Sequence, residues 1–432
     1  MSIIEPKILK GFRDFLPQQE MQRKHLIRTL EDTFESYGFV PIDTPVLEYT
    51  EVLLGKGSGE TDKQLYRFND NGGRDVAMRF DLTVPFARYT AANRHNLYMP
   101  FKRYHINKVW RGEKSQKGRY REFYQCDFDM VGVDNACADF EILQLMNKSF
   151  QVLPVGDYQF HLSHRGLFNL FLEREGLIDN SVGILRTVDK LAKIGRDKTL
   201  EQLKEFASED KANKILDFIS QKGEFIQVLS QLELLSGGSS EASERLREIW
   251  KLIESQGLAD KFILDPSITR GLDYYTGIVY ETFLTEAQDI GSVCSGGRYN
   301  NLAGLYTKEE LPGVGSSIGL DRLLAAMEAL NNEEQNYGPQ VIIFNQDKEL
   351  YPYYYQLAED LRQDGFMTEV YPLSKKLPQQ FKFAEAKGFT FGLIVGQNER
   401  AENRLNLKDL RSRETKDRLS YEEVVAYIKD RV

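Results

Sequence analysis

The sequence is poor in cysteine and has no long apolar segment. Its three cysteines, Cys126, Cys137 and Cys294, are too few and too widely spaced for a disulfide framework or a metal knuckle, which favours a reducing, cytoplasmic location. No apolar run reaches the roughly eighteen residues that a membrane-spanning helix needs. The first twenty residues carry charges throughout and lack an apolar core, so we expect neither a secretory signal nor a membrane partner.

The chain also lacks an excess of positive charge. Its 432 residues carry a net charge of −9, so any nucleic-acid binding must depend on a local patch. One candidate patch lies between Lys375 and Arg418, a segment that contains eleven Lys and Arg residues and six Asp and Glu residues. An ordinary solvated surface explains this modest surplus equally well. The overall composition, with 41% hydrophobic and 28% charged residues, is typical of a folded protein.

The apolar spacing divides the chain into segments of different character. Residues 18–37 predict an amphipathic helix, and a Leu-, Lys- and Glu-rich pattern predicts an inserted helical module at about 176–263. After a polar linker at 331–339, strands and helices alternate over residues 340–432, which predicts a small separate α/β domain. We therefore expect a first domain over residues 1–330 that contains the helical module.

Two strand-like segments, residues 103–111 and 119–131, flank a short loop from Gly112 to Gly118 and predict an antiparallel hairpin. Because side chains alternate across a strand, the apolar even positions of the second segment predict a core face. The opposite face has cations near the loop and acids at the far end, which suits a ligand that is anionic at one end and cationic at the other. A half-exposed strand with cross-strand ion pairs is the alternative. The residues of this polar face are Arg119, Arg121, Phe123, Gln125, Asp127 and Asp129.

Three further stretches combine charged residues with hydroxyl groups or glycines. Asp81 and Thr83 are two residues apart in RFDLTVP, where a strand would place both on one face, in reach of an α-amino group. The stretch TRGLDYYTG at 269–277 sets Arg270 beside two tyrosines between glycines, a pattern that plain core packing explains less well. In PGVGSSIGLDR at 312–322, glycines lead into a predicted helix, but their spacing does not fit a dinucleotide-binding loop.

Taken together, these stretches resemble the class II aminoacyl-tRNA synthetases, and specifically the histidyl-tRNA synthetase family. Residues 38–48 are similar to motif 1 of that class, the hairpin with Arg111 is similar to motif 2, and GVGSSIGLDR, ending at Arg322, is similar to motif 3. Other stretches resemble signatures specific to the histidine enzymes or the opening of the family's sequences. They are RGLDYYTG at 270–277, CSGGRYNNL at 294–302 and the N-terminal KGFRDFLP.

This resemblance implies an α+β fold and a two-step ligation. The expected architecture is a class II catalytic domain built on an antiparallel sheet, with a helical insertion, followed by a small α/β anticodon-binding domain. In the expected activity, L-histidine reacts with ATP, which arrives with Mg²⁺, to give histidyl-adenylate and pyrophosphate. The histidyl group is then transferred to the 3′-terminal adenosine of the histidine tRNA as an ester. A cytoplasmic homodimer is expected, without a dedicated metal site in the protein.

The resemblance also implies roles for individual residues. Arg111 and Arg270 are expected to be catalytic, because they would stabilise charge at the histidine carboxylate and the α-phosphate. Asp129 would face the imidazole ring. The histidine site would comprise Asp81, Thr83, Arg111, Gln125, Asp129, Arg270, Tyr274 and Tyr275. The ATP site would comprise Arg111, Glu113, Arg119 and Arg322, with Glu113 near the adenine and Arg322 at the γ-phosphate.

The chain departs from the pattern of many bacterial relatives at three acids. Asp81 and Asp129 stand where glutamate is common, and Asp321 precedes Arg322 where motif 3 commonly ends Glu-Arg. The alternative function is that of a non-catalytic paralogue, the regulatory subunit of ATP phosphoribosyltransferase. Such paralogues lack the tRNA-reading domain and lose catalytic arginines, whereas this chain keeps the arginines and about ninety C-terminal residues of α/β pattern.

Overall fold

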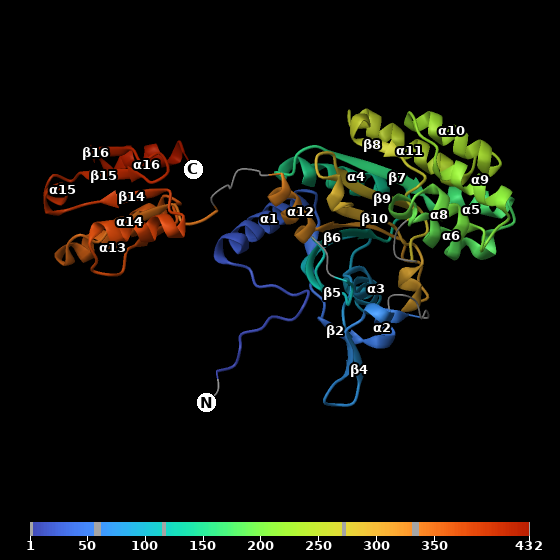
Figure 1. The fold of residues 1–432 in the computed structure, drawn as a ribbon, viewed down its shortest axis with the longest axis horizontal. Coiled ribbons are helices and arrows are strands. Elements are labelled where there is room, and N and C mark those ends of the chain that lie inside the picture. Colours follow the sequence, from blue (N-terminus) through green and yellow to red (C-terminus); the bar gives the residue numbers. More distant parts are fainter. Residues whose placement is uncertain (1–2, 56–61, 115–117, 270–273, 331–336, 432) are drawn as a thin grey trace. The chain divides into compact units, whose positions relative to one another are not determined.

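The protein divides into two compact units, each of which is described by itself. The first comprises Met1–Asp14 and Leu26–Asn332, and the second comprises Phe15–His25 and Glu333–Val432. Figure 1 shows the chain as a computed structural model. The structure describes residues 3–55, 62–114, 118–269, 274–330 and 337–431.

An eight-stranded sheet is the centre of the first unit. Its strand order is β1-β5-β6-β11-β10-β9-β7-β8, with parallel pairs only at the two edges, β1 with β5 and β7 with β8. The expected antiparallel sheet is therefore confirmed, apart from these edge pairs. In sheet order, the strands are β1 (Val40–Pro41), β5 (Phe101–Trp110), β6 (Glu122–Val131), β11 (Gly313–Gly319), β10 (Cys294–Arg298), β9 (Ile278–Leu284), β7 (Tyr158–His164) and β8 (Phe262–Leu264).

The predicted hairpin is the pair β5–β6, and its register explains the two faces of β6. On the apolar face, Phe128 is fully buried and its ring lies 4.8 Å from that of Phe34, measured between centroids. Phe34 belongs to α1 (Pro17–Ser36). The polar face is also buried from Gln125 onward, so the strand is not half-exposed there, although the cross-strand ion pairs of that alternative do occur, as between Arg103 and Asp129. A buried polar face needs partners within the protein or from a ligand.

A three-stranded sheet, β2-β4-β3, lies beside the large one in the same unit. The stretch RFDLTVP, which was expected to be a strand, is not one: β4 ends at Met78, before it, and helix α3 begins within it, at Thr83. The prediction was wrong because Pro85 fits the first turn of a helix, where its missing N–H leaves no bond unmade. The elements are β2 (Leu47–Tyr49), α2 (Thr50–Leu54), β3 (Arg67–Asn69), β4 (Asp75–Met78) and α3 (Thr83–Ala92).

The prediction of a loop before Arg322, which was based on its glycines, was wrong. Residues Gly313–Gly319 were expected to lead into a helix as a loop, but they form β11, a central strand between β6 and β10. Helix α12 (Leu320–Ala329) begins only after it. Glycine is weak in a strand unless another group approaches closely, and β11 meets that condition.

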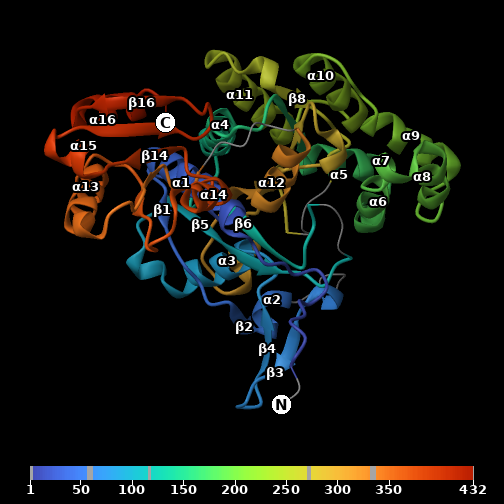
Figure 2. The ribbon, with the colours of Figure 1, turned by 60° about the vertical axis from the view of Figure 1, so that its left-hand side comes forward.

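The helical module forms one side of the first unit, where Figures 1 and 2 both show it as a group of green and yellow helices. Most of its helices bury one face; in the last of them, Leu246, Ile249 and Ile253 are fully buried. Helices occupy Arg165–Ser255, so they begin earlier than expected and end before strand β8. They are α5 (Arg165–Arg174), α6 (Ser181–Val188), α7 (Leu191–Ile194), α8 (Arg196–Leu203), α9 (Glu209–Ile219), α10 (Phe225–Ser236) and α11 (Glu241–Ser255).

The second unit contains a five-stranded mixed sheet of order β13-β12-β14-β15-β16 with helices around it. The predicted α/β alternation is confirmed, but β16 was missed because its residues are charged and mostly exposed at a sheet edge. The strands are β12 (Val341–Ile343), β13 (Thr368–Val370), β14 (Phe391–Ile394), β15 (Leu405–Asp409) and β16 (Thr415–Leu419). The helices are α13 (Tyr351–Gln363), α14 (Leu377–Lys387), α15 (Gln397–Ala401) and α16 (Tyr421–Lys429). Across the described ranges of both units, no helix has the length and apolarity to cross a membrane.

Candidate active site

A cavity lies in the first unit between the β5–β6 loop, β6, β11 and the start of α12. Cations dominate the predicted residues around it, with one acid and one amide. This cavity brings together all four residues of the predicted ATP site. It also includes Gln125 from the predicted histidine site. The five predicted residues that line it are Arg111, Glu113, Arg119, Gln125 and Arg322.

Arg111 is held in a defined orientation at the end of β5. Its backbone N–H donates to the carbonyl of Arg121 at 2.9 Å, and its Nε donates to the carbonyl of Phe80 at 2.9 Å. The guanidinium also lies 5.1 Å from the ring centroid of Phe123. Because Nε is used for positioning, the fork of terminal nitrogens is oriented for a carboxylate or a phosphate.

Arg322 stands in the first turn of α12 and lines the same cavity. Its Nη1 donates to the carbonyl of Ser292. The preceding acid, Asp321, is buried; it accepts a hydrogen bond from the backbone of Tyr124 at 2.8 Å and pairs with Arg13. Asp321 therefore connects the N-terminal segment and the hairpin to α12. These contacts hold the neighbouring Arg322 in position.

Beyond Gln125, the polar face of β6 runs deeper into the unit. Asp129 stands opposite Arg103 of β5 in the strand register, and the two side chains form an ion pair at 2.7 Å. The hydroxyl of Tyr299 donates to the other carboxylate oxygen of Asp129 at 2.5 Å. Burial raises the pKa of Asp129, and Arg103 opposes that rise. Asp129 is thus deeply buried and already holds two protein partners.

Three tyrosines form an aromatic wall next to this face. The ring centroid of Tyr274 lies 4.9 Å from that of Tyr275 and 5.9 Å from that of Tyr299. Burial raises the pKa of all three hydroxyls, so they remain neutral hydrogen-bond donors at physiological pH. Offset aromatic rings of this kind suit a slot for a flat ring.

Glycines on β10 and β11 make room for the wall and for the acid. A Cβ on Gly315 would come within 2.0 Å of Oδ1 of Asp129, and one on Gly297 would come within 2.9 Å of the ring of Tyr275. The glycines in these strands are therefore needed for close approach.

Asp81 and Thr83 do not share a strand face, contrary to the sequence-based expectation. Asp81 lies in the loop before α3, and Thr83 is the first residue of that helix. The carboxylate of Asp81 accepts a hydrogen bond from the backbone of Val84 at 3.2 Å and one from the hydroxyl of Tyr274 at 3.4 Å. Burial raises the pKa of Asp81 to about 6, against the opposing charge of Arg111.

The two groups of predicted residues meet at Arg111. Its Nε bonds the carbonyl of Phe80, the residue before Asp81, and β6 carries Gln125 and Asp129 on one face. The cationic cavity therefore adjoins a group of acids and tyrosines. Such an arrangement can bind an anion at one end and hydrogen-bond donors at the other.

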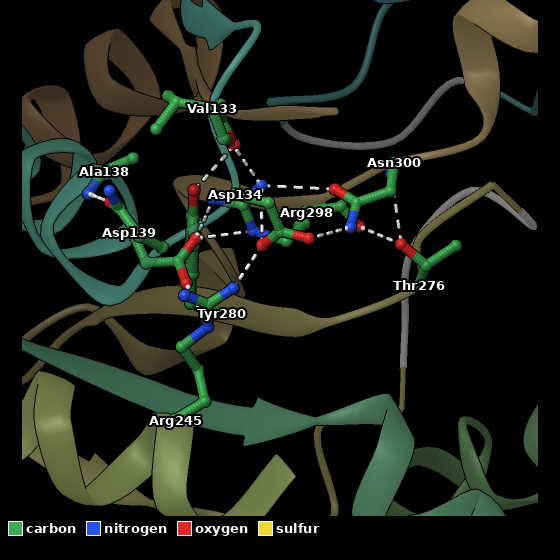
Figure 3. Close-up of polar contacts among 11 residues, drawn as sticks. Val133, Asp134, Ala138, Asp139, Arg245, Thr276, Tyr280, Arg298 and Asn300 are labelled. Atoms are coloured by element: carbon green, nitrogen blue, oxygen red, sulfur yellow. Dashed lines mark hydrogen bonds and ion pairs between the residues drawn. The ribbon is translucent and has the colours of Figure 1, made fainter. Parts of the chain in front are cut away.

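A polar network, buried at Arg298 and Asp139, anchors the end of the tyrosine segment (Figure 3). The backbone N–H of Thr276 donates to the carbonyl of Arg298 at 2.8 Å, and the Thr276 hydroxyl accepts from the backbone N–H of Asn300 at 3.1 Å. Arg298 is 3% exposed and lies 2.6 Å from Asp139 of α4 (Ala136–Val152), which is 1% exposed. Through this network, β10 and α4 fix the position of the two tyrosines.

The same network reaches the helical module. Arg245 of α11 pairs with Asp134 and lies 3.4 Å from Asp139. Asp134 in turn accepts from the side chain of Asn300 at 2.6 Å. Figure 3 shows Arg245 pointing from α11 toward the two acids.

The predicted catalytic residue Arg270 lies outside the described residues. Among those that are described, no three His, Cys, Asp or Glu side chains are grouped as a metal site would require. Sequence reasoning assigned no site role to Arg13, Arg103, Arg298 and Tyr299, because each acts through a partner elsewhere in the chain. It placed Asp127 on the polar face of the hairpin but gave it no role of its own. Arg103 left a readable signal, since it faces the acid of the opposite hairpin strand.

Comparisons with known proteins show which family and fold the chain resembles. Residues 11–323 match the family model described as Histidyl-tRNA synthetase, and residues 340–431 match the Anticodon binding domain. The chain is 49% identical to a histidine–tRNA ligase of Treponema denticola over 442 residues, which cover 99% of this chain and 98% of that protein. It is 46% identical to a histidine–tRNA ligase of Rhodopirellula baltica, with 96% of each covered.

Solved structures show the same similarity. The crystal structure of histidyl-tRNA synthetase from a Nostoc species matches with a TM-score of 0.89 and 33% identity, and all of both chains is covered. A Bacillus halodurans structure titled as an ATP phosphoribosyltransferase regulatory subunit/histidyl-tRNA synthetase matches with a TM-score of 0.74 at 22% identity, covering 90% of this chain and 97% of that one. At that identity the likeness shows a shared fold only.

Proposed function

Because the chain belongs to the histidyl-tRNA synthetase family, we propose that it is a ligase that activates L-histidine with ATP and then esterifies the 3′-terminal adenosine of the histidine tRNA. The full-length relatives carry the ligase name, and a match to the Anticodon binding domain follows the catalytic unit. The regulatory-subunit alternative is therefore not favoured.

The observation that carries this proposal is the junction at Arg111. One side of this arginine faces a cavity with Arg119 and Arg322, and the other side adjoins buried Asp81. A triphosphate needs the cations, and an amino acid needs a cation for its carboxylate and an acceptor for its ammonium group. Arg111 lies between the cationic cavity and Asp81, so it can contact both the phosphate and the amino acid carboxylate.

In the first proposed step, a carboxylate oxygen of histidine forms a bond to the α-phosphorus of ATP, and the bond to pyrophosphate breaks. Arg111 holds the carboxylate and an α-phosphate oxygen together, so the chain contributes orientation and charge stabilisation. Glu113, Arg119 and Arg322 hold the adenine and phosphate parts. Mg²⁺ enters as part of the substrate, where it neutralises phosphate charge.

Histidine occupies the deeper pocket in this proposal. Asp81 and Thr83 take the ammonium group, while the ring lies between Gln125, Asp129, Tyr274 and Tyr275. Arg270 joins Arg111 at the reacting phosphate, a role that rests on the family resemblance. In the second step, a hydroxyl of the terminal adenosine forms an ester with the carbonyl carbon, and AMP leaves.

We also propose that the protein is a cytoplasmic homodimer. Tyr49 and Phe68, opposite each other across Val76 of β4, are 49% and 45% exposed, and Leu47 is 44% exposed. Val40, in β1 of the large sheet, is a further exposed apolar residue, with 47% of its surface accessible. Large apolar side chains gathered on one small sheet suit a self-complementary interface between two copies.

The decisive experiment is ATP–pyrophosphate exchange, screened against all twenty amino acids. We expect exchange with histidine alone in the wild-type protein. Arg111→Ala should lower kcat/KM for histidine by about 10²-fold or more, as expected when a charge-stabilising donor is lost. Arg94→Ala, which changes a partly exposed arginine paired with Glu309, is the matched control and should leave the rate unchanged.

Exchange with a different amino acid would keep the reaction but refute the specificity. If no amino acid supports exchange, the proposed activity is wrong. Charging of histidine tRNA transcripts would then test the second step, and size-exclusion chromatography with light scattering would test the dimer.

A further inference from the structure

Asp127, in the middle of β6, is a buried carboxylate without a hydrogen-bond partner. It is 1% exposed, and neither oxygen accepts a hydrogen bond from any residue that the structure describes. Its neighbour on the same strand face, Asp129, has a different environment, because Tyr299 and Arg103 occupy its two oxygens. A buried acceptor that lacks a donor is costly, and such groups are rare in native proteins.

The strand register shows that the neighbours of Asp127 offer it at most one hydroxyl group. On β5 it stands opposite His105, whose Nε2 lies 3.0 Å from Asp43. Burial lowers the pKa of His105, so this ring is neutral and offers Asp127 no cation. On β11 it stands opposite Ser317, whose hydroxyl accepts from Gln125 at 2.8 Å and weakly favours the ionised form of Asp127.

The electrostatic surroundings of Asp127 combine two arginines, Arg103 and Arg79, with two acids and the tyrosine wall. Arg103 favours the ionised form, but it lies 2.7 Å from Asp129. Asp129 and Asp81 oppose ionisation, and burial has the largest effect, so the pKa of Asp127 is raised. A ligand that brings an N–H donor would supply what the protein does not.

A second unpartnered acceptor lies next to Asp127 on the same face. Oε1 of Gln125 is buried without a hydrogen bond within the described ranges, while its Nε2 is held by Ser317. Gln125 and Ser317 both line the cavity. The row of free acceptors therefore starts at the cavity wall and continues inward, along the path that a bound amino acid side chain would take.

We propose that Asp127 is a further specificity-determining residue, whose carboxylate accepts a hydrogen bond from the ring N–H of bound histidine. The inference rests on the proposed function. Asp81 is placed for the ammonium group, so the ring N–H is the donor left for Asp127. Asp129 keeps its predicted place in the pocket, but its oxygens also hold Arg103 and Tyr299.

The consequence is selection against rings that lack an N–H. A flat five-membered ring without that donor would fill the slot and leave a buried carboxylate unsatisfied. Pockets that are built to hydrogen-bond a substrate group reject analogues without it by factors of about 10⁴. Asp127 would contribute to that rejection.

The test compares L-histidine with β-(4-thiazolyl)alanine, a similar amino acid whose ring has no N–H. The kcat/KM ratio of the two substrates in ATP–pyrophosphate exchange is measured for the full-length wild type, Asp127→Asn and Asp210→Asn. Asp127→Asn should lower the ratio at least tenfold and raise KM for histidine, with KM for ATP unchanged. Asp210, whose side chain is 77% exposed in the helical module, provides the matched control and should leave the ratio unchanged.

Each other outcome has a definite meaning. An equal loss for both substrates would place Asp127 at a shared group and refute the ring contact, and an unchanged ratio would refute any role in selection. If Asp127→Asn does not fold, Asp127→Glu, which keeps the charge but moves it, must lower the same ratio or the inference fails. Absence of histidine-dependent exchange in the wild type would instead refute the proposed function.

Discussion

The ion pair between Arg298 and Asp139 predicts a large loss of stability when Arg298 is replaced by methionine. The guanidinium is 3% exposed and donates to Asp139 at 2.8 Å through Nε, with Nη2 at 2.6 Å from the same carboxylate oxygen. It also donates to the carbonyl of Val133 at 3.0 Å and to Asn300 at 3.2 Å. Methionine keeps much of the side-chain length and removes all of these donors.

The expected magnitude follows from burial. Asp139 is 1% exposed, and after the substitution its nearest cation is Arg245 at 3.4 Å. Removal of one partner from a buried pair costs about 3–5 kcal/mol, because the other charge stays buried and uncompensated. Arg94, which is 34% exposed and paired with Glu309, gives the matched control, since loss of a surface pair costs about 0.2–1 kcal/mol.

The pH dependence of the loss provides an independent check. Burial already raises the pKa of Asp139, and Arg298 opposes that rise. Without Arg298 the folded-state pKa rises further, and a group with a raised folded pKa loses stability as pH rises through that value. The deficit of Arg298→Met should therefore be largest near pH 8 and smaller near pH 5.

Tryptophan fluorescence during urea unfolding is the suitable assay. The chain has two tryptophans, Trp110 and Trp250, and both lie buried in the first unit, so the signal reports that unit alone. A loss below about 1 kcal/mol for Arg298→Met, or a deficit that grows toward acid pH, would refute the reasoning about the buried pair.

Two further predictions concern the pocket itself. Gly315→Ala should raise KM for histidine at least tenfold, because its Cβ would lie 2.0 Å from Asp129, whereas Gly304→Ala, with open space around its Cβ, should leave KM unchanged. Equal KM values for the two variants would contradict this steric argument. Asp81→Asn should stabilise the free protein at pH 8 by on the order of 3 kcal/mol, because burial raises the pKa of Asp81 to about 6 and so disfavours the carboxylate. This gain should fade in urea titrations as pH falls below about 6, and a constant gain across pH would argue against it.

Much of the fold could be predicted from periodicity, because the relevant signal is local. The hairpin β5–β6 and the alternation in the second unit follow directly from apolar spacing. Local signals failed where a residue type has two meanings. Pro85 was taken to continue a strand but lies in the first turn of α3, and the glycines of β11 were taken as a loop but form a central strand.

The site could be predicted only in part, because some of its residues contact sequence neighbours and others contact residues far away in the sequence. Arg111 and Gln125 belong to one hairpin, where parity shows which side chains share a face. The partners Tyr299 and Asp129 are 170 residues apart, and Arg13 and Asp321 are 308 residues apart. No spacing rule connects such pairs, since the connection depends on how the sheet is assembled.

Two buried carboxylates of this unit show how pairing separates a structural role from a binding role. Asp139 and Asp127 are both 1% exposed, yet Asp139 meets two arginines, whereas neither oxygen of Asp127 accepts a hydrogen bond within the described ranges. Removal of a partner from Asp139 should destabilise the fold, because the protein itself satisfies that charge. Replacement of Asp127 by a neutral isostere should instead preserve the fold and weaken ligand selection, since buried acceptors that the protein leaves unsatisfied are available to a substrate. Under the proposed role, burial of Asp127 on β6 would shield its acceptors from water until a ring N–H donor enters.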